Sequence, residues 1–429
     1  MMVIRNISQA LATPRILVGS LTLLGLIYIL TAYSSASRVD TLYSTTSTKC
    51  TPYHTYGQLT ANADIPELNR FHPFQDDCKA PQLMRALRSL AGIEPSQGVK
   101  QDGWQGENIN WAKGKTVLMI GDSVVRNQLE HFCSFMNVTP QYHQFPSSGN
   151  LHKRASKQAS LPHTCYIPQI DFLLISAFHF GVDEDNFWRE KDQFNPPGLF
   201  EDRVDAVFLP LVQSIDTLVP MAKPHSGKNS RRSIDLIEVS SGMWDLARFA
   251  SRDIVEGRST ITDFDRDQLL WFKSRIGRMI QKVVEAFPSS KVVWRGIHYP
   301  SDKNAKIDWF MGWNWDDSTK HRPFFHHNRI LQLDQAARSA IADLNTYTFQ
   351  SRPIEFSEWG SLLLGQHAHQ QDQLHPGKSP AGWLGADMML FELREAVFRK
   401  PRTRSYPPPP PPPLQHESPH PDSHPAPSV

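Results

Sequence analysis

Three polar residues in two distant segments of the chain could together perform nucleophilic catalysis. Ser123 follows the apolar run 117–120 through a Gly-Asp pair, and an amphipathic helical pattern begins directly after it. Far downstream, Asp372 and His375 are separated by two residues. A serine hydroxyl is a weak nucleophile, and a histidine oriented by a carboxylate can activate it as a base. We therefore predict that Ser123 is the nucleophile, that His375 is its base, and that Asp372 fixes the tautomer of His375.

Other residues that follow predicted strands could complete such a site. The backbone N–H of Ser123 can donate to an oxyanion, whereas we expect the side chain of Asp122 to anchor the turn. Glycines at strand ends could let a second N–H approach, and arginines could bind polar groups of a substrate. The residues in question are Gly181, Gly242 and Trp244 on the oxyanion and substrate side, with Arg126 and Arg295 as the arginines. Packing is the alternative role for the first three, and an ordinary ion pair for each arginine.

A metal site is the competing interpretation of the histidine-rich segment. His367 and His369 would share one face of an extended chain, and together with Asp372 and His375 they could ligate zinc. No further cluster of ligands completes such a site. We therefore expect neither a bound metal nor a bound cofactor.

Apolar runs alternate with helical patterns between residues 71 and 400. The predicted strands are Thr116–Ile120, Asp171–Ile175, Leu236–Val239 and Val292–Trp294, and helical patterns include 125–136, 269–287, 330–344 and 383–398. Strands that alternate with helices predict an α/β fold, in which a largely parallel sheet carries helices on both faces. Sites in such sheets lie at the carboxyl ends of the strands, where Ser123 would stand.

The two ends of the chain differ from this central region. Residues 16–33 form an uncharged apolar run, preceded by Arg5 and Arg15, which predicts a single membrane anchor with residues 1–15 in the cytosol and the body in a lumen. A cleaved signal peptide is the alternative, because small residues follow at 34–37. Residues 34–70 are predicted to be a stem, 71–400 the catalytic domain, and 401–429 a disordered proline-rich tail.

Composition and cysteine usage narrow the function further. With 40% hydrophobic residues among 429, the chain can bury a sizeable core, and its 45 basic against 43 acidic residues form no dense basic tract, which excludes nucleic acid as a partner. All four cysteines lie beyond the predicted anchor, where an oxidising lumen allows disulfides. Three pairings exist, and we expect Cys50–Cys78 with Cys133–Cys165. The alternative is that Cys133 is simply a buried helix residue.

Four blocks of the sequence together resemble one known family. They are 121–128 with Glu130 and Cys133, 71–78, Trp294-Arg295, and 372–375. This combination is similar to the GDSL/SGNH-like acyl-esterases (PC-esterases), in the branch that holds plant trichome-birefringence-like proteins and fungal capsule O-acetylation proteins. The resemblance spans roughly residues 71 to 400. It implies a three-layer α/β/α sandwich, a Ser/His/Asp triad and acetylation of polysaccharide hydroxyls in the Golgi.

Three hypotheses about function follow. The first is a single-pass type II membrane enzyme of the Golgi or another secretory membrane, which transfers an acetyl group through Ser123 to a glycan or polysaccharide. Its co-substrate would be acetyl-CoA or another acetyl ester. The second is an esterase that uses the same acyl-enzyme but releases the acyl group to water. The third is a non-catalytic glycan-binding protein.

Overall fold

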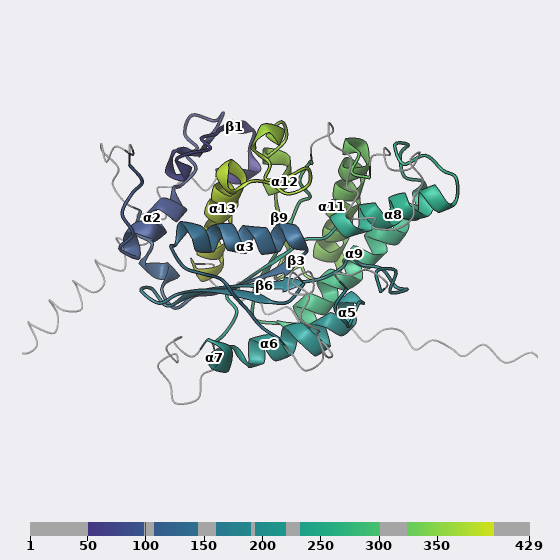
Figure 1. Ribbon diagram of the computed structural model, residues 1–429, viewed down its shortest axis with the longest axis horizontal. Helices are drawn as coiled ribbons and strands as arrows, with labels where there is room; N and C mark the ends of the chain where they lie inside the picture. Colours follow the sequence, from purple (N-terminus) through teal and green to yellow (C-terminus); the bar gives the residue numbers. More distant parts are fainter. Residues whose placement is uncertain are drawn as a thin grey trace, which may run out of the picture. The chain divides into compact units, whose positions relative to one another are not determined.

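One mixed sheet of seven strands forms the centre of the described part of the chain (Figure 1). The structure is a computed structural model, and it describes residues 50–97, 99, 107–144, 160–189, 194–219, 232–300 and 324–398. In their order across the sheet, the strands are β4 (Gln141–Tyr142), β5 (His163–Ile167), β6 (Phe172–Phe178), β3 (Thr116–Gly121), β7 (Leu236–Val239), β8 (Lys291–Arg295) and β9 (Glu355–Ser357).

Five neighbouring strands, from β6 to β9, run parallel, as the alternation of apolar runs and helices predicted. The strand β4 pairs antiparallel with β5, and β5 pairs antiparallel with β6; the sequence did not predict β4 or β5. The second predicted strand also begins one residue later than expected. Asp171 has a φ of 53°, a left-handed conformation that belongs to a turn rather than a strand. The mostly parallel α/β fold is nevertheless confirmed.

Helices cover both faces of the sheet. Along β3, Val117 and Met119 contribute to one core cluster and Leu118 and Ile120 to the other, because successive side chains of a strand point to opposite faces. The first cluster includes residues of α2 (Leu83–Leu90), α3 (Ser123–Phe135) and α13 (Trp383–Phe398). The second includes residues of α5 (Phe200–Arg203), α6 (Leu209–Gln213), α7 (Ile215–Leu218), α8 (Met243–Val255), α9 (Arg266–Ala286) and α11 (His327–Tyr347).

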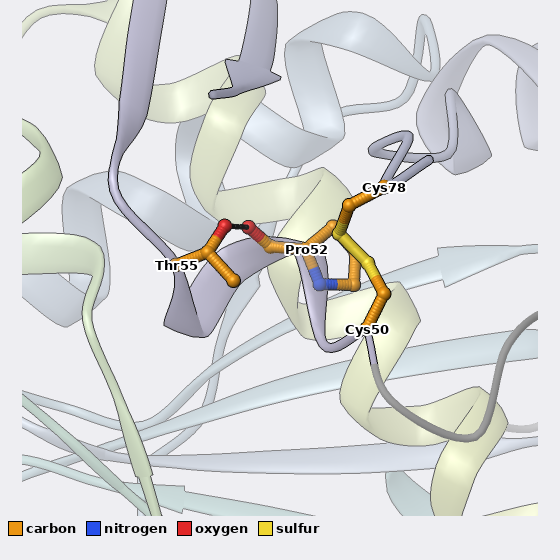
Figure 2. Close-up of a disulfide and its surroundings, with 4 residues drawn as sticks. All are labelled: Cys50, Pro52, Thr55 and Cys78. Carbon is orange, nitrogen blue, oxygen red and sulfur yellow. Dashed lines mark hydrogen bonds between the residues drawn. A yellow bond between two sulfur atoms is a disulfide. The ribbon is translucent and has the colours of Figure 1, made fainter. Parts of the chain in front are cut away.

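A separate two-stranded hairpin, β1 (Gly57–Thr60) with β2 (Arg70–Pro73), precedes this sheet. Figure 2 shows the disulfide between Cys50 and Cys78 that joins the chain on either side of the hairpin. Tyr53 is buried here, and its ring meets that of Phe391 on α13 at 5.5 Å between centroids. Part of the range predicted as a stem is therefore packed against the α/β body.

Both predicted disulfides are confirmed, because Cys133 also pairs with Cys165. This second disulfide ties α3 to β5, and both cysteines are fully buried. The described residues contain no free cysteine.

The predicted membrane anchor at 16–33 and the proline-rich tail at 401–429 lie outside the described residues. Within the described ranges, no helix combines the length and the apolar character that crossing a membrane requires.

Candidate active site

Ser123 is the first residue of α3, directly beyond the carboxyl end of the central strand β3. The turn before it is tight, since a Cβ on Gly121 would lie 2.2 Å from Cγ2 of Val125. Asp122 caps the helix, because its Oδ1 accepts the backbone N–H of Val124 at 2.9 Å. The carboxylate of Asp122 thus holds the turn, as predicted, and Ser123 is presented at the sheet edge beside a helix N-terminus.

The segment that holds Asp372 and His375 folds back onto Ser123. The imidazole Nε2 of His375 lies 2.8 Å from Oγ of Ser123, and its Nδ1 lies 2.8 Å from Oδ2 of Asp372. An ionised carboxylate only accepts hydrogen bonds, so Nδ1 of His375 must carry the proton. The lone pair of Nε2 therefore faces the serine hydroxyl. The structure brings all three predicted residues together in the geometry that a serine nucleophile requires.

Local hydrogen bonds hold Asp372 ionised. Its Oδ1 accepts the backbone N–H groups of Leu374 at 2.8 Å and of His375 at 2.7 Å. Partial burial by itself raises the pKa of Asp372, but the hydrogen bond and charge of His375, together with these two N–H groups, lower the pKa to about 2. At neutral pH the carboxylate is therefore charged and fixes the His375 tautomer.

Three side chains hold the stretch 374–382, which includes His375, and sequence reasoning assigned none of them a role. His298, beyond β8, donates from Nε2 to the carbonyl of Leu374 at 2.6 Å. The indole of Trp359, in α12 (Trp359–Leu362), donates to the carbonyl of Ala381 at 3.1 Å, and Gln128 of α3 donates to Gly382 at 3.1 Å. Burial lowers the pKa of His298 to about 3, so this imidazole stays neutral. One feature of the sequence could have pointed to His298: it follows a predicted strand that ends at the same sheet edge as the strand before Ser123.

Arg295 is the last residue of β8 and lies at the sheet edge where β3 also ends. A hollow of about 20 Å³ is lined by Arg295 and by Asp122 and Val124, the two sequence neighbours of Ser123. The guanidinium is buried, stacks over the Trp359 ring at 4.6 Å, and approaches Oγ of Ser240 at 3.4 Å. Burial lowers the pKa of Arg295, although the nearby carboxylates of Glu238 and Asp122 oppose that effect.

The structure gives Gly181 a different role from the predicted oxyanion donor. Its backbone N–H donates to Nδ1 of His179 at 3.1 Å and is therefore engaged. Gly181 has a φ of +88°, and a Cβ there would lie 2.6 Å from Oδ1 of Asp245. That buried carboxylate accepts the N–H of Val182 and the hydroxyl of Ser241, which joins the loops after β6 and β7. Gly181 makes room for this link between the two loops.

Trp244 is a core residue, contrary to the prediction that it binds substrate. Its ring is buried and meets the rings of Phe180 at 5.1 Å and Trp188 at 4.8 Å, both edge-on. The first turn of α8 directs this side chain toward the cluster beneath the sheet edge. The sequence could not distinguish a strand-end tryptophan that lines the site from one that packs below it.

Gly242 lies at the N-terminus of α8, where the backbone φ is +141°. A Cβ at this position would lie 2.2 Å from Cδ1 of Ile297, so close packing requires glycine. Its neighbours Ser241 and Met243 line the hollow beside Ser123. Arg126 forms an ion pair along its own helix, with 3.5 Å between its Nε and Oε1 of Glu130. A substrate contact for Gly242 or Arg126 stays a prediction.

The alternative zinc ligands do not gather. His367 and His369 lie in a short 3-10 helix, and His375 instead contacts Ser123 and Asp372. In the described portion of the chain, no group of three or more His, Cys, Asp or Glu side chains is arranged to hold a metal ion.

Comparisons with known proteins show only a limited similarity between this chain and solved structures. The sequence matches no protein-family model and no curated protein. Solved structures similar to this chain include a GDSL-like lipase from Parabacteroides merdae, with 12% identity over 68% of this chain and 100% of the other, at a TM-score of 0.31. Phospholipase A1 from Streptomyces albidoflavus shows 11% identity over 65% and 98%, at a TM-score of 0.30. A lipase/acylhydrolase from Enterococcus faecalis shows 13% identity over 68% and 100%, at a TM-score of 0.28.

Proposed function

We propose that this chain is a serine-dependent acyl-ester enzyme that transfers an acetyl group to a hydroxyl of a glycan or polysaccharide. The observation that carries the proposal is the chain of two 2.8 Å contacts from Ser123 through His375 to Asp372. These contacts join residues 252 positions apart in the sequence, and they place Nε2 of the His375 imidazole against the serine hydroxyl. An arrangement of this kind is how proteins activate serine for acyl transfer.

The reaction has two halves. In the first, Oγ of Ser123 attacks the carbonyl carbon of an acetyl ester or thioester, and Nε2 of His375 takes the hydroxyl proton and passes it to the departing group. The backbone N–H of Ser123, at the N-terminus of α3, can donate to the oxygen that becomes negative. In the second half, His375 takes the proton of an incoming hydroxyl, which attacks the acetyl-serine ester. The proton then returns to Oγ of Ser123.

Hydrolysis is the second candidate, and one observation favours it. The carboxylate side chain of Asp372 is 49% exposed, so water reaches the immediate surroundings of His375. Water could therefore replace the sugar hydroxyl in the second half of the reaction. The first half is the same for both candidates.

A location in a secretory membrane, facing the lumen, is part of the proposal. It is supported by the apolar segment 16–33 and by two disulfides, because disulfides persist in oxidising compartments. The acetyl donor would be acetyl-CoA or another acetyl ester.

Incubation of the full-length protein with p-nitrophenyl acetate, with and without an oligosaccharide, tests the proposal. We expect two products, an acetylated oligosaccharide and an acetylated Ser123. The acetyl group should add about 42 Da to the peptide that contains Ser123, at about one acetyl group per chain. A yield of free acetate that does not change when the oligosaccharide is added would favour hydrolysis over transfer. Absence of any adduct would contradict both candidates.

Two serine variants make this experiment specific. Ser123→Ala should abolish the adduct and reduce turnover by about 10⁴-fold or more. Ser89→Ala removes an exposed hydroxyl on α2 and should change neither. Equal turnover in the two variants would contradict the assignment of Ser123.

A further inference from the structure

The chain contains two acceptor sequences for N-linked glycosylation, Asn6-Ile-Ser8 and Asn137-Val-Thr139. They lie on opposite sides of the apolar segment 16–33, which we predict to be the membrane anchor. In the predicted orientation, residues 1–15 are cytosolic, and only Asn137 faces the lumen in which such sequences are modified. The sequence thus singles out one candidate asparagine, and the structure shows its surroundings.

Asn137 lies just beyond the C-terminus of α3, in the short connection to β4. Asn137 and Thr139 are both exposed, whereas Val138 between them is partly buried against the apolar core. Within the part of the chain that the structure describes, neither the carboxamide of Asn137 nor the hydroxyl of Thr139 makes a hydrogen bond. The two side chains that N-glycosylation requires are therefore open to solvent.

Backbone contacts, rather than the side chain of Asn137, hold this connection in place. The φ of Asn137 is 54°, a left-handed conformation that asparagine adopts more readily than most residues. Its N–H donates to the carbonyl of Ser134 at 3.3 Å, and the N–H of Val138 donates to the carbonyl of Cys133 at 3.0 Å. Cys133 is itself fixed by its disulfide to Cys165. A group added to the carboxamide of Asn137 would therefore break no hydrogen bond of the fold.

A glycan on Asn137 would leave the active site open. Ser123 is the first residue of α3, and at about 1.5 Å per residue the 13 residues of this helix separate the two sites by about 20 Å. The glycan would instead stand beside β4, which is exposed and ends the sheet among the described strands. Edge strands pair readily with other chains, so a bulky group beside β4 would protect this edge.

We propose that Asn137 carries an N-linked oligosaccharide. Nδ2 of Asn137 forms a bond to the anomeric carbon of an oligosaccharide that is carried on a lipid pyrophosphate. The bond between that carbon and the pyrophosphate breaks, and the carboxamide loses one proton. The hydroxyl of Thr139 supplies the second group of the acceptor sequence. The inference rests on the lumenal location that is part of the proposed function, and it adds a covalent modification to it.

Pro140 directly follows the acceptor sequence and limits the yield. A residue before proline is restricted to extended backbone, so Thr139 has less freedom to adopt the conformation that the transferring enzyme binds. We expect part of the chains to carry the glycan, and we expect Pro140→Ala to raise the glycosylated fraction by about twofold.

Mass spectrometry of the full-length protein from eukaryotic cells tests the inference. Removal of N-linked glycans by a peptide:N-glycanase in ¹⁸O water converts each glycosylated asparagine to an aspartate that is about 3 Da heavier. We expect this gain at Asn137 and not at Asn6. Asn137→Gln and Thr139→Ala should each abolish it, whereas Thr139→Ser keeps the hydroxyl and should retain it.

Protease treatment of intact microsomes separates this inference from the predicted location. A protected body without the mass gain at Asn137, in both the parent and Pro140→Ala, would overturn the inference alone. A body that is digested without detergent, or a mass gain at Asn6 instead, would overturn the lumenal location and the inference with it.

The serine chemistry is tested independently of the glycan. Asn137→Gln should hydrolyse p-nitrophenyl acetate at the parental rate, because the glycan lies at the far end of α3 from Ser123. A mass gain at Asn137 without an acetyl adduct on Ser123 would reject only the proposed reaction.

Discussion

Replacing Asp372 with asparagine should separate catalysis from stability. Oδ1 of Asp372 accepts two backbone N–H groups, and Oδ2 accepts the Nδ1–H of the His375 imidazole. An asparagine can keep the first two bonds through its carbonyl oxygen, but its NH₂ group then faces Nδ1 of His375. Because NH₂ donates, Nδ1 must become the acceptor, and the proton moves to Nε2. The lone pair that should accept the proton of Ser123 is then lost, so we expect turnover to fall by about 10⁴-fold.

The expected loss of stability is small by comparison. The pKa of Asp372 is lowered from 3.8 to about 2. A shift of this size corresponds to about 2.5 kcal/mol for a shielded group. Because the side chain is 49% exposed, solvent screening reduces this to about 1 kcal/mol. The folded-state pKa is the lower one, so the contribution is present above pH 3.8 and is lost as the pH falls toward about 2.

Two measurements check this prediction. Release of p-nitrophenol from p-nitrophenyl acetate gives the turnover of Asp372→Asn, and thermal unfolding at pH 7 gives its midpoint, which we expect to fall by about 2 °C. The difference in midpoint between the two proteins should shrink between pH 3.8 and about 2. A loss of turnover below tenfold would refute the tautomer argument. A midpoint below the assay temperature would show that the loss comes from unfolding instead.

Two further predictions concern the groups that position the site. His298→Ala removes the donor to the carbonyl of Leu374, and we expect kcat to fall by about 10²-fold with little change in KM, because the imidazole of His375 is displaced. His298→Gln, which can restore the donor, should recover part of kcat, and an unchanged kcat in the alanine variant would count against this role. The double replacement Cys133→Ala and Cys165→Ala opens a link of 32 residues between two fully buried positions and should cost about 3–4 kcal/mol in urea unfolding. An unfolding free energy equal to that of the parent would contradict it.

Several features of the fold could be predicted because their signals are local. The strand β3 is buried on both faces, so its residues 117–120 appear in the sequence as a continuous hydrophobic segment. The helical pattern after Ser123 matches the buried face of α3. Strands without that signal were missed. The antiparallel β5 begins with His163 and Thr164, and the pairing of β5 with β6 buries polar side chains that look like a loop in the sequence.

The same distinction applies to the candidate site. Ser123, Asp372 and His375 carry recognisable chemistry, but Gly181 and Trp244 were assigned to the site only because they follow strands. The structure engages the N–H of Gly181 with His179 and turns Trp244 into the core. A strand end fixes the edge of the sheet where a residue lies. It does not fix the direction of the side chain, which depends on neighbours that are distant in the sequence.

The sequence alone determined the types of chemistry available and the edge of the sheet where they would meet. It placed a serine between a strand and a helix N-terminus, a carboxylate three residues before a histidine, and four cysteines whose pairing it left open among three possibilities. Only the tertiary structure decided that the Asp/His segment reaches Ser123. His298, Trp359 and Gln128 hold the stretch 374–382 around His375, from the loop after β8 and from the helices α12 and α3. Their hydrogen bonds form after the sheet and its helices have packed, so no local pattern of residues records them.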